Sequence, residues 1–308
     1  MDVAFLSLLG GGALFLGREI SKRLFAEPLS QKIRVWAHQK IIPKGTIAPK
    51  EIHTRIDLAY QLFLSSKALR TDCIPPTAWS HKPPDVELPS GGKTYGHEAA
   101  VLESILSFVQ QGNIDIQVKD DFWVANTGSS RIILASGGPN VATREIIGTP
   151  ETPGFCPKLS AFPVKLAYAI GMGEGPIKRM QYGELIERRA LSVHKATGRE
   201  RLQAETDAGR QKTDYLLVTR VPGRTKGTVY TVLAGLHGPG TRSAELLFSS
   251  VPPKDLEDLA SRIGHRPGQV PFFQAVFRAS QFRTIDGSDV PSQMELVTER
   301  FPPIRIRG

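Results

Sequence analysis

Cysteine is scarce in this chain. Only Cys73 and Cys156 occur among 308 residues, and neither belongs to a CxxC pair or a Cys/His cluster. A structural zinc site and a disulfide framework both require more cysteine than this. We therefore expect two free or buried thiols in a reducing compartment, with no metal site and no bound cofactor.

Composition and charge restrict the class of protein further. Hydrophobic residues make up 40% of the chain and charged residues 22%, which excludes disorder of the whole chain. A net charge of +9 is compatible with nucleic-acid binding. Most of the basic excess, however, lies in residues 18–50, and no RNP-like, zinc-finger or helix-turn-helix pattern is present. We expect no nucleic-acid partner.

Residues 3–17 (VAFLSLLGGGALFLG) contain no charge and are followed by Arg18, Lys22 and Arg23. A helix needs about 17–25 apolar residues to span a bilayer, and basic residues beside such a segment stay in the cytoplasm. The sequence thus predicts a membrane anchor at residues 1–24 that contacts lipid. The protein would be a single-pass membrane protein with one transmembrane helix and its bulk in the cytoplasm. A buried N-terminal helix or strand of a soluble protein is the alternative.

Five prolines in residues 73–92 indicate a linker. The linker ends a helical and extended segment, residues 25–92, and residues 93–308 are expected to form an α/β ligand-binding domain. There, helical periodicity over residues 96–111 alternates with strand-like runs at 131–136, 228–234 and 272–279. This alternation predicts an α/β fold, a Rossmann-like three-layer domain with a largely parallel sheet, preceded by the N-terminal apolar helix.

Two loops share the order of strand, glycine turn and helix-compatible segment: RIILAS before residues 137–140 (GGPN), and TVYTVLAG before residues 236–241 (LHGPGT). Ligands of open α/β sheets bind at the carboxyl ends of strands, where the next helix offers N–H groups to anions. Ordinary tight turns and helix caps are the alternative. Neither loop matches GxGxxG, so NAD binding does not follow from them. The candidate ligand-binding residues are Gly137, Gly138, Asn140, Arg144, Gly235, Gly238, Gly240, Thr241 and Arg242, with both arginines as phosphate clamps.

His237 is the candidate for chemistry, because an imidazole at the end of a strand can act as acid or base near neutral pH. Asp214 and Glu145 are candidate partners, although linear sequence cannot pair them with His237. His97 opens the helix after the linker and reaches the same site if that helix packs beside it.

These features predict a membrane-anchored, cytoplasm-facing sensor or effector for signalling. It would bind a small anionic ligand, a nucleotide or another phosphate-bearing molecule. One alternative is a hydrolase or transferase of a nucleotide-like or glycosidic substrate, with His237 as acid or base. A second is a non-catalytic, membrane-associated scaffold. The sequence leaves open whether the chain forms a homo-oligomer.

Overall fold

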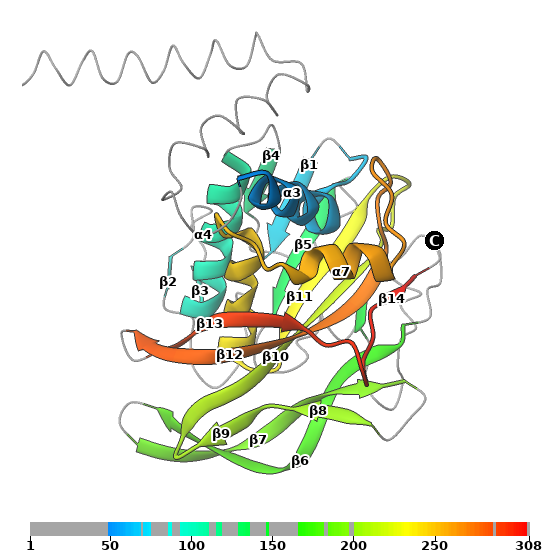
Figure 1. Cartoon of the computed structure of the whole chain (residues 1–308). Helices are drawn as coiled ribbons and strands as arrows, with labels where there is room; N and C mark the ends of the chain where they lie inside the picture. Colours follow the sequence, from blue (N-terminus) through cyan, green and yellow to red (C-terminus); the bar gives the residue numbers. More distant parts are fainter. Residues whose placement is uncertain are drawn as a thin grey trace, which may run out of the picture. The chain divides into compact units, whose positions relative to one another are not determined.

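Figure 1 shows the computed structural model of the chain, which divides into two compact units, Met1–His53 and Thr54–Gly308. The predicted membrane anchor, residues 1–24, and most of the predicted linker lie outside the described residues. All described strands belong to the second unit. The structure describes residues 49–68, 70–74, 86–87, 93–110, 115–118, 129–135, 146–147, 166–181, 184–196, 200–285 and 288–306.

A mixed sheet forms the centre of the second unit. In the described part of the chain its order is β13–β12–β10–β11–β5–β1–β4, with β14 paired to β12 and β9 to β10. Strands β4, β1, β5 and β11 pair in parallel, whereas β10, β12 and β13 pair antiparallel. The bounds are β1 (Arg70–Ile74), β4 (Asp115–Val118), β5 (Ser130–Ala135), β9 (Glu205–Asp207), β10 (Arg210–Pro222), β11 (Val229–Gly235), β12 (Phe273–Ile285), β13 (Ser288–Leu296) and β14 (Ile304–Arg305).

The prediction of a Rossmann-like, largely parallel sheet is wrong. Only residues 223–228 join β10 to β11, and only residues 286–287 join β12 to β13. A parallel crossover needs a dozen or more residues, so these short connections impose antiparallel pairing. The prediction of nucleotide binding rested on glycine loops in a Rossmann-like sheet, and that of signalling rested on the membrane segment; neither prediction is supported without that fold and that segment.

Helical segments cover one face of the large sheet (Figure 1). In α4 the residues that pack inward have the predicted helical spacing, namely Val101, Leu102, Ile105 and Val109. They share a hydrophobic core with residues of β5 and β10 that point to this face, among them Leu134. The segments are α3 (Pro49–Ala59), the π-helical η1 (Tyr60–Leu64), α4 (Gly96–Gln110), α6 (Gly238–Arg242), the 3-10 helix η2 (Ser243–Phe248) and α7 (Asp255–Arg262).

A smaller three-stranded sheet packs on the opposite face (Figure 1). It consists of β6 (Tyr168–Gln181), β7 (Glu184–Lys195) and β8 (Arg201–Gln203). Ile133 of β5 and Leu217 of β10 point to this face and pack with Tyr168 and Val193 in a second hydrophobic core. The layers are therefore helices, large sheet and small sheet. A separate pair, β2 (Val86–Glu87) and β3 (Lys93–Thr94), is antiparallel.

Several elements expected from the sequence are confirmed. The helix expected at residues 96–111 is α4, and the strands expected at 131–136, 228–234 and 272–279 correspond to β5, β11 and the first part of β12. Every residue of β11 is buried. A strand in the middle of a sheet that is covered on both faces reads as a continuous apolar run, which explains why β11 was recognisable.

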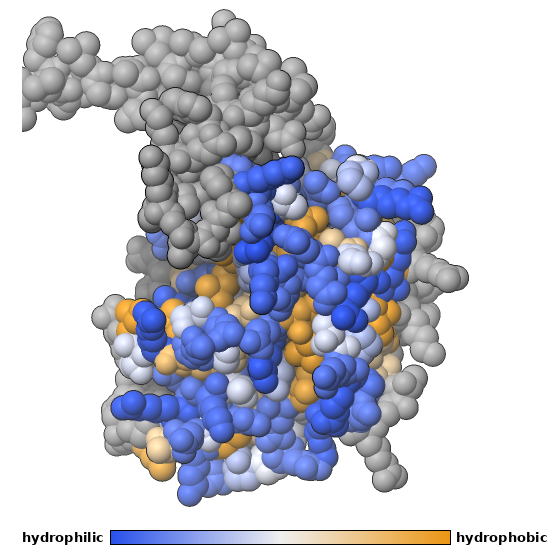
Figure 2. All heavy atoms as spheres, viewed as in Figure 1, coloured by the Kyte–Doolittle hydropathy of each residue, from blue (hydrophilic) through white to orange (hydrophobic). Residues whose placement is uncertain are grey.

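The prediction of a single-pass membrane location is corrected by the described helices. In the part of the chain that the structure describes, no helix is both long enough and apolar enough to cross a bilayer. On the face drawn in Figure 2, hydrophilic residues cover most of the described surface, and hydrophobic residues show in separate groups. The large hydrophobic side chains that are most exposed lie on different elements: Met172, Leu185, Val251 and Ile285.

The fully buried guanidinium of Arg220, on β10, holds the end of η1. Nη1 donates to the carbonyl oxygens of Gln61, at 3.1 Å, and Leu62, and Nη2 donates to that of Ser65. The last carbonyls of a helix have no partner within the helix, so these bonds satisfy them away from water. Burial lowers the pKa of Arg220 to about 9. Arg220 thus ties the helical layer to the sheet.

We expect Arg220→Met to lower the free energy of unfolding by about 2–4 kcal/mol, because buried carbonyls lose their donors. Urea unfolding followed by circular dichroism measures this change. Arg220→Lys is the matched variant, which keeps the charge but not the forked donors, and we expect it to recover only part of the loss. An unchanged midpoint for Arg220→Met would contradict the assigned role.

Cys73 on β1 is a free, fully buried thiol, as the sequence indicated, and burial raises its pKa to about 12. We expect Cys73 to resist iodoacetamide at pH 8 in the folded protein, because the reactive thiolate is suppressed and access is blocked. Peptide mapping by mass spectrometry checks this, with the urea-unfolded chain as the control. Rapid alkylation of Cys73 under native conditions would show that β1 opens.

Candidate functional site

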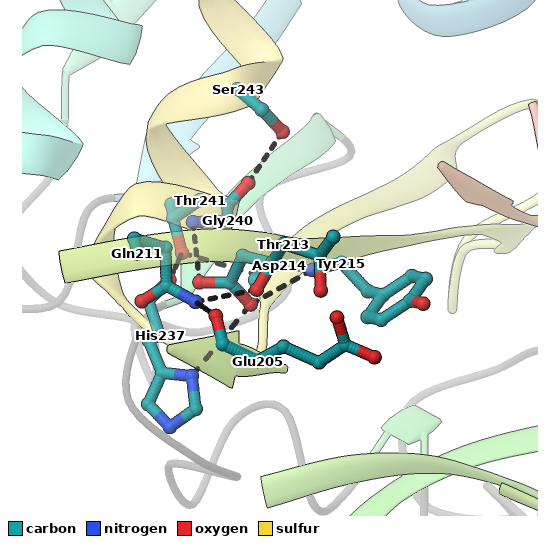
Figure 3. A network of polar contacts seen from close by, with 10 residues as sticks. Glu205, Gln211, Thr213, Asp214, Tyr215, His237, Gly240, Thr241 and Ser243 are labelled. Atoms are coloured by element: carbon teal, nitrogen blue, oxygen red, sulfur yellow. Dashed lines mark hydrogen bonds and ion pairs between the residues drawn. The ribbon is translucent and has the colours of Figure 1, made fainter. Parts of the chain in front are cut away.

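Asp214 lies at the centre of a polar network between β10 and the loop that follows β11 (Figure 3). Leu216 pairs with Gly235 across the two antiparallel strands, so Asp214 lies beside this loop. Its side chain is fully buried. Oδ1 accepts the N–H of Tyr215 at 2.8 Å, and Oδ2 accepts the N–H of Gly240 at 2.9 Å. A carboxylate without water needs such donors, and here both oxygens have one.

His237 lies next to Asp214 and is 94% buried, with 6% of its surface exposed. Its Nδ1 lies 3.7 Å from Oδ1 of Asp214. Among the described residues, neither ring nitrogen has a hydrogen-bond partner. Figure 3 shows one ring nitrogen facing Asp214 and the other facing away from the network. The structure therefore places His237 beside Asp214, one of the two candidate partners that the sequence named; the other, Glu145, lies outside the described residues.

Backbone hydrogen bonds fix the loop that carries His237. The N–H of Leu236 donates to the carbonyl oxygen of Tyr215 at 2.9 Å, and that of Thr241 donates to the carbonyl oxygen of His237 at 3.0 Å. Oγ1 of Thr241 accepts the N–H of Gly235 at 3.2 Å. Thr241, a predicted ligand-binding residue, thus closes the loop on itself and holds the backbone of His237 in place.

The three glycines of this loop provide space for close packing. A Cβ at Gly240 would lie 2.8 Å from Cγ of Asp214, and one at Gly235 would lie 1.9 Å from the backbone nitrogen of Thr241. A Cβ at Gly238 would lie 2.2 Å from the ring of His97. The imidazole of His97, from the first turn of α4, therefore lies against the loop, as expected if α4 packed beside it.

The other predicted loop follows β5. Gly137, Gly138, Asn140 and Arg144 lie outside the described residues, so their part in a site stays a prediction. The strand before them is placed: β5 pairs in parallel with β11, with Ala135 opposite Ala234. Both loops thus leave the same edge of the sheet from neighbouring strands, which is the arrangement that a shared site requires.

Arg242 was predicted to clamp a phosphate, and the structure places it in an ion pair. Its Nε lies 2.8 Å from Oε1 of Glu245. Burial raises the pKa of Glu245, while Arg242 opposes that rise and Glu103 adds to it. The guanidinium of Arg242 is therefore paired with the partly buried carboxylate of Glu245 on η2.

Gln211 is a residue of the network that sequence reasoning missed. Its Nε2 donates to the carbonyl oxygens of Glu205, at 3.1 Å, and Thr213. These bonds brace the irregular pairing of β9 and β10 that leads to Asp214. No local signal in the sequence marks Gln211, because residues 197–213 are polar and show no periodicity.

We expect Gly240→Ala to destabilise the fold by about 1–3 kcal/mol, since its Cβ would press on Asp214 and on the carbonyl oxygen of Tyr215. Gly96→Ala is the matched control, because a Cβ there meets nothing within 4 Å. We expect the control to stay within about 1 kcal/mol of wild type. Urea unfolding measures both, and equal stabilities of the two variants would contradict the close packing of the loop.

Asp214 and His237 thus lie together where β11 ends, and His97 lies against Gly238 of the same loop. Within the described residues, no group of three or more His, Cys, Asp or Glu side chains could hold a metal ion. No protein-family model matches this chain, and comparisons with curated proteins and with solved structures find no match.

Proposed function

We propose that the protein is an enzyme in which His237, oriented by Asp214, acts as the general acid and base of a hydrolysis or group transfer. The observation that carries this proposal is the buried imidazole whose Nδ1 lies 3.7 Å from a fully buried carboxylate and whose ring nitrogens lack hydrogen bonds to described residues. The paired groups are those of a general base and its orienting carboxylate.

The cost of the arrangement supports the proposal. A buried polar group without a hydrogen bond costs about 1–3 kcal/mol, and His237 carries two such nitrogens. A water molecule or substrate that reaches the nitrogen facing away from the network would supply its missing hydrogen-bond partner. In the proposed mechanism, Nε2 is therefore the atom that exchanges protons.

The two residues have separate roles. The Asp214 carboxylate favours a proton on Nδ1, because it can only accept, and it stabilises the imidazolium once formed. Nε2 then removes a proton from a water molecule or an alcohol as its oxygen attacks the electrophilic centre of the substrate. The bond to the leaving group breaks, and Nε2 returns the proton to that group. No oxidant or other co-reactant is needed.

The position of His237 favours ligand access on topological grounds. It follows β11, and β11, β5 and β1 are successive parallel neighbours in the sheet. The carboxyl ends of such strands form the edge at which open α/β sheets bind ligands. The proposal needs only this local parallel arrangement.

We expect the wild-type chain to turn over at least one substrate in a panel of 4-nitrophenyl acetate, phosphate and glycosides. His237→Ala should lower kcat by about 10²–10⁴-fold, the usual contribution of general acid–base catalysis. Asp214→Asn should also lower kcat. His194→Ala is the matched control, because this histidine of β7 bonds to Ser192 in the small sheet, and its kcat should equal that of wild type.

A spectroscopic measurement tests the same pair without a substrate. We expect ¹⁵N NMR of the imidazole to show the Nδ1–H tautomer for His237 in wild type and loss of that preference in Asp214→Asn. Thermal unfolding of each variant checks that it is folded. An Nε2–H tautomer in wild type, or turnover that survives His237→Ala, would overturn the proposal.

A further inference from the structure

A cavity of about 970 Å³ lies at the opposite end of β10 and β11 from His237. Pro222, the last residue of β10, and Val229, the first residue of β11, line it, whereas Asp214 and His237 flank the other end of these strands. The seven residues of β11, which lie between the cavity and His237, span about 20 Å at a rise of about 3.3 Å per residue. The cavity is therefore distinct from the candidate catalytic site.

Among the described residues that line this cavity, four carry cationic side chains and none carries a carboxylate. The cations are Lys67 after η1, Lys226 in the β10–β11 turn, Arg266 in the α7–β12 loop and Arg305 on β14. In the described part of the chain none of the four forms an ion pair with Asp or Glu. Cations that gather on one cavity repel each other, and the ~8 Å Debye length of physiological salt screens this only in part.

The floor of the cavity is apolar. Val229, Ile263 and Ile306 line it and are buried, and Phe272 lies beside them. A small-molecule site has this composition, a hydrophobic surface with a few polar groups that fix orientation, and such sites have volumes of about 300–1,000 Å³. The volume and the floor suit a compact organic molecule, and the charges select an anion.

The walls of the cavity are held by tight turns. Gly227 and Gly268 have φ values of +88° and +78°, which favour glycine. The N–H of Lys67 donates to the carbonyl oxygen of Gly227 at 3.2 Å, which joins the end of η1 to the β10–β11 turn. Nη1 of Arg305 donates to the carbonyl oxygen of Gly264 at 3.4 Å, which joins β14 to the α7–β12 loop. The cationic groups are thus brought together before any ligand binds.

The β10–β11 turn and the α7–β12 loop lie side by side at one corner of the second unit (Figure 1). Hydrophilic residues gather at that corner in Figure 2. We propose that this cavity binds a small organic anion with at least two negative charges, carried by phosphate groups. Arg266 and Arg305 suit phosphate because a guanidinium donates two parallel hydrogen bonds to it. Lys67 and Lys226 add point charges, and all four cationic residues are exposed.

Isothermal titration calorimetry of the full chain with inorganic tripolyphosphate tests the proposal. We expect binding with a Kd below about 1 mM that weakens as NaCl is raised. Arg266→Gln/Arg305→Gln should weaken binding at least tenfold. The matched control is Arg210→Gln/Arg283→Gln, which removes two exposed arginines near the far ends of β10 and β12 and should bind like wild type.

Four comparisons make the result decisive. Citrate should bind more weakly than tripolyphosphate, and equal binding would overturn the choice of phosphate. A short oligothymidylate that binds more tightly than tripolyphosphate would overturn a small-molecule site in favour of a nucleic-acid surface. Equal affinities of the two double variants, with both shown folded by thermal unfolding, would overturn the site. His237→Ala should bind tripolyphosphate like wild type, so failure of this proposal and failure of the catalytic proposal are distinguishable.

Discussion

The buried carboxylate of Asp214 is the constraint on which the candidate site depends. A charge removed from water must be met by donors, and here they are the backbone N–H groups of Tyr215 and Gly240. The bond to Gly240 draws the loop after β11 against β10 so closely that residue 240 has no room for a Cβ. The same approach brings the imidazole of His237 to the carboxylate, so one interaction sets both the loop and the proposed catalytic pair.

Strand β10 carries a second buried charge toward its other end. Asp214 and Arg220 are six positions apart on the strand, and an even difference puts both side chains on the same, helical face of the sheet. Asp214 holds the loop that begins α6, and Arg220 holds the end of η1. Beyond Arg220 the strand leads into the cationic cavity. The chemistry proposed for the molecule therefore lies at the two ends of one strand, with hydrophobic core between them.

The parallel and antiparallel halves of the mixed sheet have different roles. The parallel strands β1, β5 and β11 direct their carboxyl ends to the edge where His237 lies. The antiparallel strands β10, β12 and β13 form hairpin connections, and residues of β10 and β12 support the small sheet through the second core. Both cores use alternate residues of the same strands, since neighbouring side chains point to opposite faces. The fold can therefore combine a helical layer with a strand layer around one sheet.

The sequence by itself determined the elements with strong local patterns: the helical spacing of α4, the apolar runs of β5 and β11, and the glycine loop with His237. It named Asp214 and His97 as neighbours of His237 but could not select them, because their approach depends on antiparallel pairing and on helix packing between distant segments. It did not reveal Gln211.

Only the tertiary structure decided the direction of β10 and β12, although the short connections limited the choice. Only the tertiary structure gathered Lys67, Lys226, Arg266 and Arg305, which appear in the sequence as scattered surface charges. Local periodicity specifies which face of an element is apolar, whereas a site assembled from separate segments exists only once those faces are packed together.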